Sequence, residues 1–145
     1  MERRTRVSAY AWSVRDGAVL LARIAADRPD GGKRTLPGGG LDWGEHPEDA
    51  MHRELGEETG LDGEITGMVG IDSITVDAPQ LPGSPSWHAI RIVNRVSVDD
   101  APPRVTEIDG SVDAAAWHRI DDLDDLPIVD LVEYALVASG DAPAR

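Results

Sequence analysis

The sequence predicts an α+β fold in which helices cover a mixed β-sheet. Five runs of apolar and β-branched residues have the length and alternation of strands, and they cover residues 7–14, 18–24, 63–76, 88–98 and 113–120. Two further segments have helical spacing, and they do not alternate strictly with the strands as in a parallel βαβ fold. A chain of 145 residues can bury one core, so residues 1–145 are expected to form a single domain.

The first two strand runs are predicted to pair as a β-hairpin. Arg15, Asp16 and Gly17 separate residues 7–14 from residues 18–24, and Asp-Gly between two apolar runs is the strongest short hairpin signal. Residues 27–34 are rich in Gly, Pro and Asp and are predicted to form a loop. The next segment, TLPGGGLDWGE, contains four glycines, which allow a close approach of backbone to a ligand or a positive φ.

A helix is predicted over residues 47–59. Pro47 suits its first position, and the acids Glu48 and Asp49 are favourable in a first turn. Gly60 supplies a left-handed stop at the other end. The residue before Pro47 is His46 rather than Ser or Thr, so capping by a hydroxyl is absent and a weaker cap is expected.

The second half of the chain contains the remaining strands and a second helix. A Pro-rich loop separates the strands 63–76 and 88–98, and a turn at Asp109-Gly110 precedes the strand 113–120. The acidic run 120–127 lacks the ligand spacing of a calcium loop and is expected to be a solvated turn. An amphipathic helix is predicted in PIVDLVEYALVAS, with Ile128, Leu131, Val132, Ala135 and Leu136 on its apolar face.

Composition limits the partners and the compartment. The net charge of −13 repels phosphate backbones and anionic surfaces, so neither bulk nucleic acid nor a membrane is an expected partner. No segment approaches the roughly 20 apolar residues of a membrane-spanning helix. The absence of cysteine excludes disulfides and thiolate metal sites, and a cytoplasmic protein is therefore expected.

The segment RELGEETG, residues 53–60, carries three acids where its helix disfavours them. Glu54, Glu57 and Glu58 share an arc of about 100° near the predicted C-terminus. The helix macrodipole and mutual repulsion each cost a few tenths to about 1 kcal/mol per acid there. Hard divalent cations bind oxygen ligands and would reverse both penalties, so the cluster predicts a metal site.

The spacing around these acids resembles a known motif. Five residues separate Gly39 from Glu45, seven separate Glu45 from Arg53, and the chain continues as Arg-Glu-Leu-Gly-Glu-Glu-Thr-Gly-Leu. This is similar to the Nudix box, G-x5-E-x7-R-E-U-x-E-E-x-G-U with U an apolar residue, and it agrees at every defined position. The box covers residues 39–61, and the order of strands and helices around it also resembles that family. The resemblance implies the Nudix-type α/β/α sandwich.

The same resemblance implies a MutT-like hydrolase that uses Mg²⁺, or Mn²⁺ in its place. Such enzymes cleave a nucleoside diphosphate linked to another moiety. By position, Glu57 and Glu58 would be the principal metal ligands, and Glu54 would be a further ligand or the base for the attacking water. The backbone carbonyl of Gly39 would complete the shell, and Arg53 would orient Glu54.

Three further positions follow from the resemblance. Glu45 would brace the loop and the helix without touching the substrate. Relatives often carry an acid shortly before the tryptophan that corresponds to Trp117, where it serves as a remote metal ligand or base. Here Asp113 and Glu107 both remain open for that role.

Substrate contacts are less specified by the sequence. Trp43 and Trp87 fall in predicted loops, where an aromatic ring could stack on a base or simply pack. Arg34 and Arg91 could contact phosphates, although an exposed arginine more often only solubilises the surface.

The predicted chemistry agrees with the residues present. Cleavage of a phosphoanhydride requires the phosphoryl charge to be offset and a water to be activated and held in line. We therefore expect a Mg²⁺-dependent pyrophosphohydrolase acting on a nucleoside triphosphate, ADP-ribose, a nucleotide sugar or a dinucleoside polyphosphate. The alternative is a sensor or regulator that binds a nucleotide without turnover, and retention of every box carboxylate favours catalysis. A homodimer is common among similar proteins, but no sequence feature specifies an interface.

Overall fold

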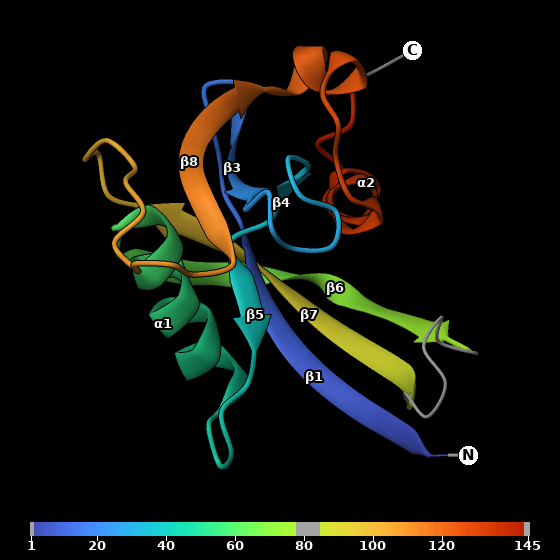
Figure 1. Cartoon of the computed structure of the whole chain (residues 1–145). Coiled ribbons are helices and arrows are strands. Elements are labelled where there is room, and N and C mark those ends of the chain that lie inside the picture. Colours follow the sequence, from blue (N-terminus) through green and yellow to red (C-terminus); the bar gives the residue numbers. More distant parts are fainter. Residues whose placement is uncertain (1, 78–84, 144–145) are drawn as a thin grey trace.

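Residues 2–77 and 85–143 are described by the structure, a computed structural model. The strands form two sheets, and the helices α1 and α2 lie on opposite sides of them (Figure 1). The elements are β1 (Arg3–Trp12), β2 (Val14–Arg15), β3 (Ala18–Ile24), β4 (Arg34–Thr35), β5 (Gly38–Gly40), α1 (Pro47–Thr59), β6 (Gly63–Val76), β7 (Ser86–Val98), β8 (Val112–Arg119), the 3-10 helix η1 (Ile120–Asp125) and α2 (Asp130–Ala138). The layers confirm the predicted α+β fold with an α/β/α arrangement.

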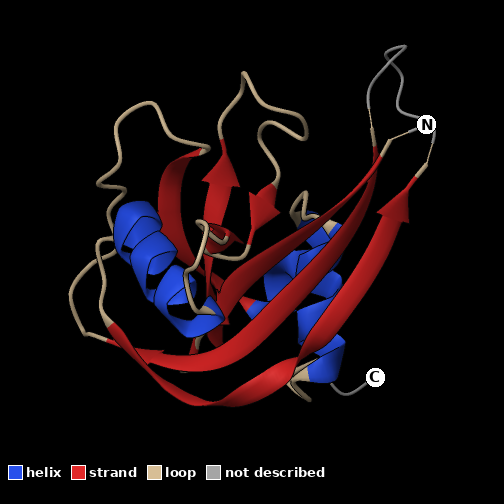
Figure 2. Ribbon diagram, turned by 90° about the horizontal axis from the view of Figure 1, so that it is seen from below, coloured by secondary structure: helices blue, strands red, loops and turns tan. Residues whose placement is uncertain are grey.

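The larger sheet has the mixed pairing that the sequence predicts. Its strand order is β5-β1-β7-β6, with β1 parallel to β7 and both outer pairs antiparallel. The smaller sheet is antiparallel, and its strand β3 pairs with β2, β4 and β8. Figure 2 shows the long strands running between the two helices. The division into two sheets is not visible in the sequence, because the strands of both sheets are similar apolar runs.

The predicted hairpin is correct in its turn and wrong in its first arm. Asp16 and Gly17 have positive φ values of 52° and 78°, and they join β2 to β3 as a two-residue turn. The run 7–14, however, breaks after Trp12, and only the short β2 pairs with β3. The preceding strand β1 pairs with β7 over its whole length, so it belongs to the other sheet.

Other boundaries agree closely with expectation, but β8 lies one residue earlier than 113–120 and the short strands β4 and β5 form where no strand was predicted. The helix 47–59 and the strand 63–76 form as predicted, and β7 begins two residues before position 88. The acidic run forms η1 rather than a simple turn, because Ile120 and Leu123 are buried. The second helix begins only at Asp130, since Ile128, two residues earlier, forms a β-bridge with Arg34 of β4. Most of the predicted Pro-rich loop, residues 78–84, lies outside the described residues.

Two apolar clusters hold the layers together. One places α1 against β1 and includes Ala9, Ala11, Ala50, Met51 and Leu55. The other packs α2 against both sheets and includes Trp12, Val19, Val93, Leu131 and Val132. No helix in the described part of the chain is long and apolar enough to cross a membrane.

Candidate active site

Helix α1 carries the candidate site, and local residues fix where it begins. Pro47 is its first residue, and the Nδ1 atom of His46 accepts a hydrogen bond of 3.1 Å from the backbone N–H of Glu48. His46 therefore does cap the helix, with a ring nitrogen in place of the hydroxyl oxygen of a Ser or Thr cap. Met51 and Leu55 are fully buried, which fixes the rotation of the helix about its axis.

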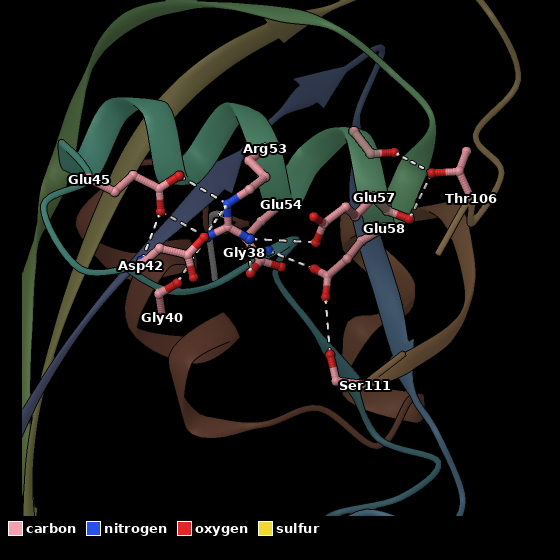
Figure 3. Close-up of polar contacts among 11 residues, drawn as sticks. Gly38, Gly40, Asp42, Glu45, Arg53, Glu54, Glu57, Glu58, Thr106 and Ser111 are labelled. Atoms are coloured by element: carbon pink, nitrogen blue, oxygen red, sulfur yellow. Dashed lines mark hydrogen bonds and ion pairs between the residues drawn. The ribbon is translucent and has the colours of Figure 1, made fainter. Parts of the chain in front are cut away.

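That rotation turns the box acids toward β5 and toward the loop before β8. Figure 3 shows Glu54, Glu57 and Glu58 along one face of α1, with Gly38 facing them and Ser111 beneath Glu58. The backbone of Gly39 lies directly against the helix, because a Cβ atom at that position would lie 2.8 Å from Oε1 of Glu54. A side chain at this position would therefore have to displace the carboxyl group of Glu54.

Arg53 links the loop before α1 to the acids on this face of the helix. Its Nε and Nη2 atoms donate to both oxygens of Glu45 at 2.9 and 2.8 Å, and Nη2 also donates to the carbonyl of Gly40 at 3.1 Å. Its Nη1 atom donates to Oε1 of Glu54 at 3.0 Å. These hydrogen bonds from Arg53 lower the pKa of Glu45 to about 2. Glu45 thus ties the loop to the helix through the same guanidinium that orients Glu54.

Glu58 is a buried carboxylate whose oxygens both have partners. It is 3% exposed, and its Oε1 accepts a hydrogen bond of 2.8 Å from the backbone N–H of Gly38. Its Oε2 accepts a weaker hydrogen bond of 3.4 Å from the hydroxyl of Ser111. Burial nevertheless dominates and raises the pKa of Glu58 to about 8.

The neighbouring acids are shifted in the same direction. Burial raises the pKa of Glu54, although the hydrogen bond from Arg53 opposes the shift. Burial also raises the pKa of Glu57, and the adjacent carboxyl group of Glu107 adds to the effect. Three carboxyl groups on one helix face are thus held in surroundings that disfavour their negative charge, as expected where a cation belongs.

The donor set fits a hard divalent cation. Carboxylate and backbone carbonyl oxygens are the ligands that Mg²⁺ and Mn²⁺ prefer. Within residues 2–77 and 85–143, no three acidic, cysteine or histidine side chains are already gathered around one point. Glu54 and Glu57 turn toward Arg53, at 3.0 and 3.6 Å, and Glu58 turns toward Gly38. The acids therefore share a face without converging.

The two candidates for the remote acid lie in different surroundings. Asp113 pairs with Arg23 at 2.7 Å, and both side chains are partly exposed on the smaller sheet. The backbone N–H of Glu107 donates to the carbonyl of Glu57 at 3.1 Å, and the carboxyl group of Glu107 contributes to the raised pKa of Glu57. The structure thus brings Glu107, and not Asp113, next to the box acids.

The four predicted substrate contacts lie in different surroundings. Trp43 is fully exposed, with a relative accessibility of 101%. The guanidinium carbon of Arg4 lies over the ring of Trp87, 5.8 Å from the ring centroid. The Nη1 atom of Arg34 donates to the carbonyl of Gly32 at 2.6 Å. The remaining contact, Arg91, is 8% exposed and pairs with Asp72 and with Asp130, which joins β7 to β6 and to α2.

Two residues near the acids had no signal in the sequence. Ser111 reaches Glu58, and Thr106 donates to backbone carbonyl oxygens of α1 (Figure 3). Both belong to the loop before β8, which follows the helix by about fifty residues, and neither is part of a periodic pattern. Only the folded arrangement of the loop shows their role.

Comparison with known proteins supports the resemblance to the Nudix family. The family model described as the NUDIX domain matches residues 3–137. An RNA pyrophosphohydrolase of Gluconacetobacter diazotrophicus is 33% identical over 125 residues, which cover 72% of this chain and 70% of that protein.

Solved structures give the same result. A MutT Nudix hydrolase from Burkholderia pseudomallei has a TM-score of 0.74 and 32% identity, covering 93% of this chain and 98% of that one. The Nudix domain of Shewanella oneidensis NrtR, solved with ADP-ribose, shares the fold at 22% identity and a TM-score of 0.61, with coverage of 93% and 87%. The chain therefore belongs to the Nudix family, and it is a hydrolase that acts on phosphoanhydride bonds.

Proposed function

We propose that this hydrolase is a Mg²⁺-dependent pyrophosphohydrolase whose substrate is a nucleoside diphosphate linked to another moiety. The substrate class comprises nucleoside triphosphates, ADP-ribose and nucleotide sugars. The observation that carries the proposal is the single helix face on which Glu54, Glu57 and Glu58 all have raised pKa values. Ionised carboxylates on such a face destabilise the fold when no cation is bound, and a bound divalent cation removes this penalty.

The residues divide the work as follows. Glu57 and Glu58 would hold the metal, with the carbonyl of Gly39 beside them, and Glu54 would be a further ligand or the base for water. Bound Mg²⁺ would offset the charge of the phosphoryl oxygens and favour ionisation of the attacking water. Arg53 keeps Glu54 oriented through its 3.0 Å hydrogen bond, and Glu45 holds Arg53 from the other side.

We assign Glu107 as the remote acid of the site. It supplies a fourth carboxyl group beside Glu57, whereas the carboxylate of Asp113 is already paired with Arg23. A fourth acid would add to the affinity for a divalent cation or accept a proton from water. Replacement of Glu107 by Gln is expected to lower activity more than replacement of Asp113 by Asn.

The experiment is a hydrolysis panel with Mg²⁺ or Mn²⁺ and with chelator. It should contain nucleoside triphosphates, ADP-ribose, nucleotide sugars, dinucleoside polyphosphates and a 5′-triphosphorylated RNA oligonucleotide, the last because a relative is an RNA pyrophosphohydrolase. Glu57→Gln and Glu58→Gln are expected to lower the rate at least about 100-fold, since even indirect partners of a metal cost 10- to 100-fold. Glu48→Gln is the matched control, because Glu48 lies at the opposite end of the same helix.

The outcomes separate the alternatives. Turnover that requires the metal and disappears in both Gln variants would support the proposal and identify the substrate. A silent panel, with Mg²⁺ still bound by the wild type, would overturn catalysis on these substrates and favour a nucleotide sensor. Turnover that survives chelation and both substitutions would overturn the metal mechanism.

A further inference from the structure

The loop before β8 supplies hydrogen-bond donors to the C-terminal end of α1. The last carbonyl groups of a helix have no partner within the helix. Here the N–H of Arg104 donates to the carbonyl of Thr59 at 2.6 Å, and the N–H groups of Thr106 and Glu107 donate to the carbonyl of Glu57 at 2.9 and 3.1 Å. We call residues 104–107 the strap, because they hold the end of the helix from about fifty residues away.

Thr106 adds its side chain to this attachment. Its hydroxyl donates to the carbonyl oxygens of Gly56 and Glu57, at 3.0 and 3.2 Å (Figure 3). The side chain is otherwise exposed and belongs to neither apolar cluster. The contribution of Thr106 is therefore the hydroxyl itself and not burial.

The backbone of the strap lies close to the end of the helix. A Cβ atom on Gly60 would lie 2.8 Å from the carbonyl oxygen of Arg104. On the far side, a Cβ atom on Gly110 would lie 3.0 Å from the carboxyl carbon of Glu107. The Glu107 side chain thus lies near Gly110, and its carboxyl group contributes to the raised pKa of Glu57.

We propose that Thr106 is a positioning residue, whose hydroxyl locks the strap onto α1 and so fixes the carboxyl group of Glu107 relative to that of Glu57. Thr106 and Glu107 are adjacent, and both bond to the residue that carries the other carboxyl group, so the separation of the two acids depends on this attachment. The inference rests on the proposed function, because the separation matters through the affinity for Mg²⁺.

The test uses two substitutions at one position. Thr106→Val removes the hydroxyl at nearly constant shape, and Thr106→Ser keeps it. Affinity for Mg²⁺ is measured by titration calorimetry without substrate, and kcat and KM are measured with the nucleotide that the wild type hydrolyses. Thr66→Val is the matched control, because the hydroxyl of Thr66 also donates to a backbone carbonyl, that of Arg95, away from the acids.

Thr106→Val is expected to weaken Mg²⁺ binding about tenfold and to lower kcat, with KM for the nucleotide unchanged. Thr106→Ser should keep the Mg²⁺ affinity and kcat within about twofold of the wild type, because serine retains the hydroxyl that orients the strap. The metal-free melting temperature of Thr106→Val should fall by only a few degrees, as expected for loss of one exposed hydrogen bond. Amide hydrogen exchange at Arg104, Thr106 and Glu107 should become faster in the same variant.

Failure of this inference differs from failure of the proposed function. Wild-type Mg²⁺ affinity in Thr106→Val would overturn the role of Thr106 while leaving the metal site intact. An equal loss in Thr106→Ser would also overturn it, because the hydroxyl would not be the active group. Absence of Mg²⁺ binding by the wild type would overturn both proposals together.

Discussion

The two ends of α1 are built in opposite ways. At the first end, neighbouring residues supply everything: His46 caps, Pro47 starts the helix, and Glu48 and Asp49 complement the macrodipole. At the second end the last turn contains no basic residue, acids stand against the dipole, and the hydrogen-bond donors come from the distant strap. Interactions between neighbouring residues thus stabilise the start of the helix, whereas its end depends on hydrogen bonds from a segment far away in the sequence.

The comparison also separates two kinds of acid. Glu48 is exposed in the first turn, where negative charge is favourable, whereas Glu58 is 3% exposed in the last turn. Removal of the charge should therefore have opposite effects on the stability of the metal-free protein. Glu48→Gln should lower the free energy of unfolding by a few tenths of a kcal/mol, and Glu58→Gln should raise it.

The largest stability effect is expected for Glu58→Gln, and it should depend on pH. The pKa of this carboxyl group is raised from 4.5 to about 8 in the folded protein, so between these values the folded form retains a proton that the unfolded chain has released. The free energy of unfolding of the wild type should therefore fall as pH rises through this window. Near pH 8 and above, metal-free Glu58→Gln should be the more stable by an amount on the order of 3 kcal/mol.

Chemical denaturation with chelator, at pH 4.5 and at pH 8.5, measures this difference. The advantage of Glu58→Gln should nearly vanish at the lower pH, where the carboxyl group is at least half protonated in both states. Excess Mg²⁺ should offset most of this advantage at the higher pH, because an ion that binds only the folded form adds about 2.7 kcal/mol at a concentration 100 times its Kd. A Glu58→Gln variant that is less stable than the wild type at pH 8.5 without metal would contradict the account.

A smaller effect distinguishes two glycines of the box. Gly60 has a φ of 69° and faces the strap, so Gly60→Ala should cost about 2 kcal/mol from backbone strain and from crowding against the carbonyl of Arg104. Gly56 lies inside the helix, and a Cβ atom there would meet nothing within 4 Å. Gly56→Ala should therefore raise the free energy of unfolding by about 0.5–1 kcal/mol. Equilibrium unfolding in urea measures both, and equal effects of the two substitutions would show that the strap does not restrict Gly60.

The same contrast explains what the sequence could predict. The bounds of α1 were predictable because Pro47 and Gly60 act on adjacent residues, and the box acids were predictable because their spacing alone sets their common face. The strap was not predictable, because its bonds join Thr106 to Gly56 across a separation that only the fold closes. The hairpin fails for the same reason: its turn is local, but long-range pairing with β7 draws β1 into the other sheet.

Burial of charge shows a second limit of the sequence. The sequence predicts Arg91 as a phosphate contact and gives no information about its partners within the protein. In the structure its guanidinium pairs with Asp72, which the strand register places directly opposite, and with Asp130 at the start of α2. The first partner follows once the register is known, and the second requires the packing of α2 on the sheet.

An effect on stability alone is expected from the cap at the first end of α1. His46→Ala should lower the free energy of unfolding by about 1 kcal/mol, because the N–H of Glu48 loses its only described side-chain acceptor. His46→Asn should retain the stability, since an Asn oxygen can accept the same hydrogen bond. Both variants should keep the hydrolysis rate and the affinity for Mg²⁺ within about twofold of the wild type, because the cap lies at the opposite end of α1 from Glu57 and Glu58. A large loss of Mg²⁺ affinity in His46→Ala would show instead that the two ends of the helix are coupled, and that the cap helps to place the acids.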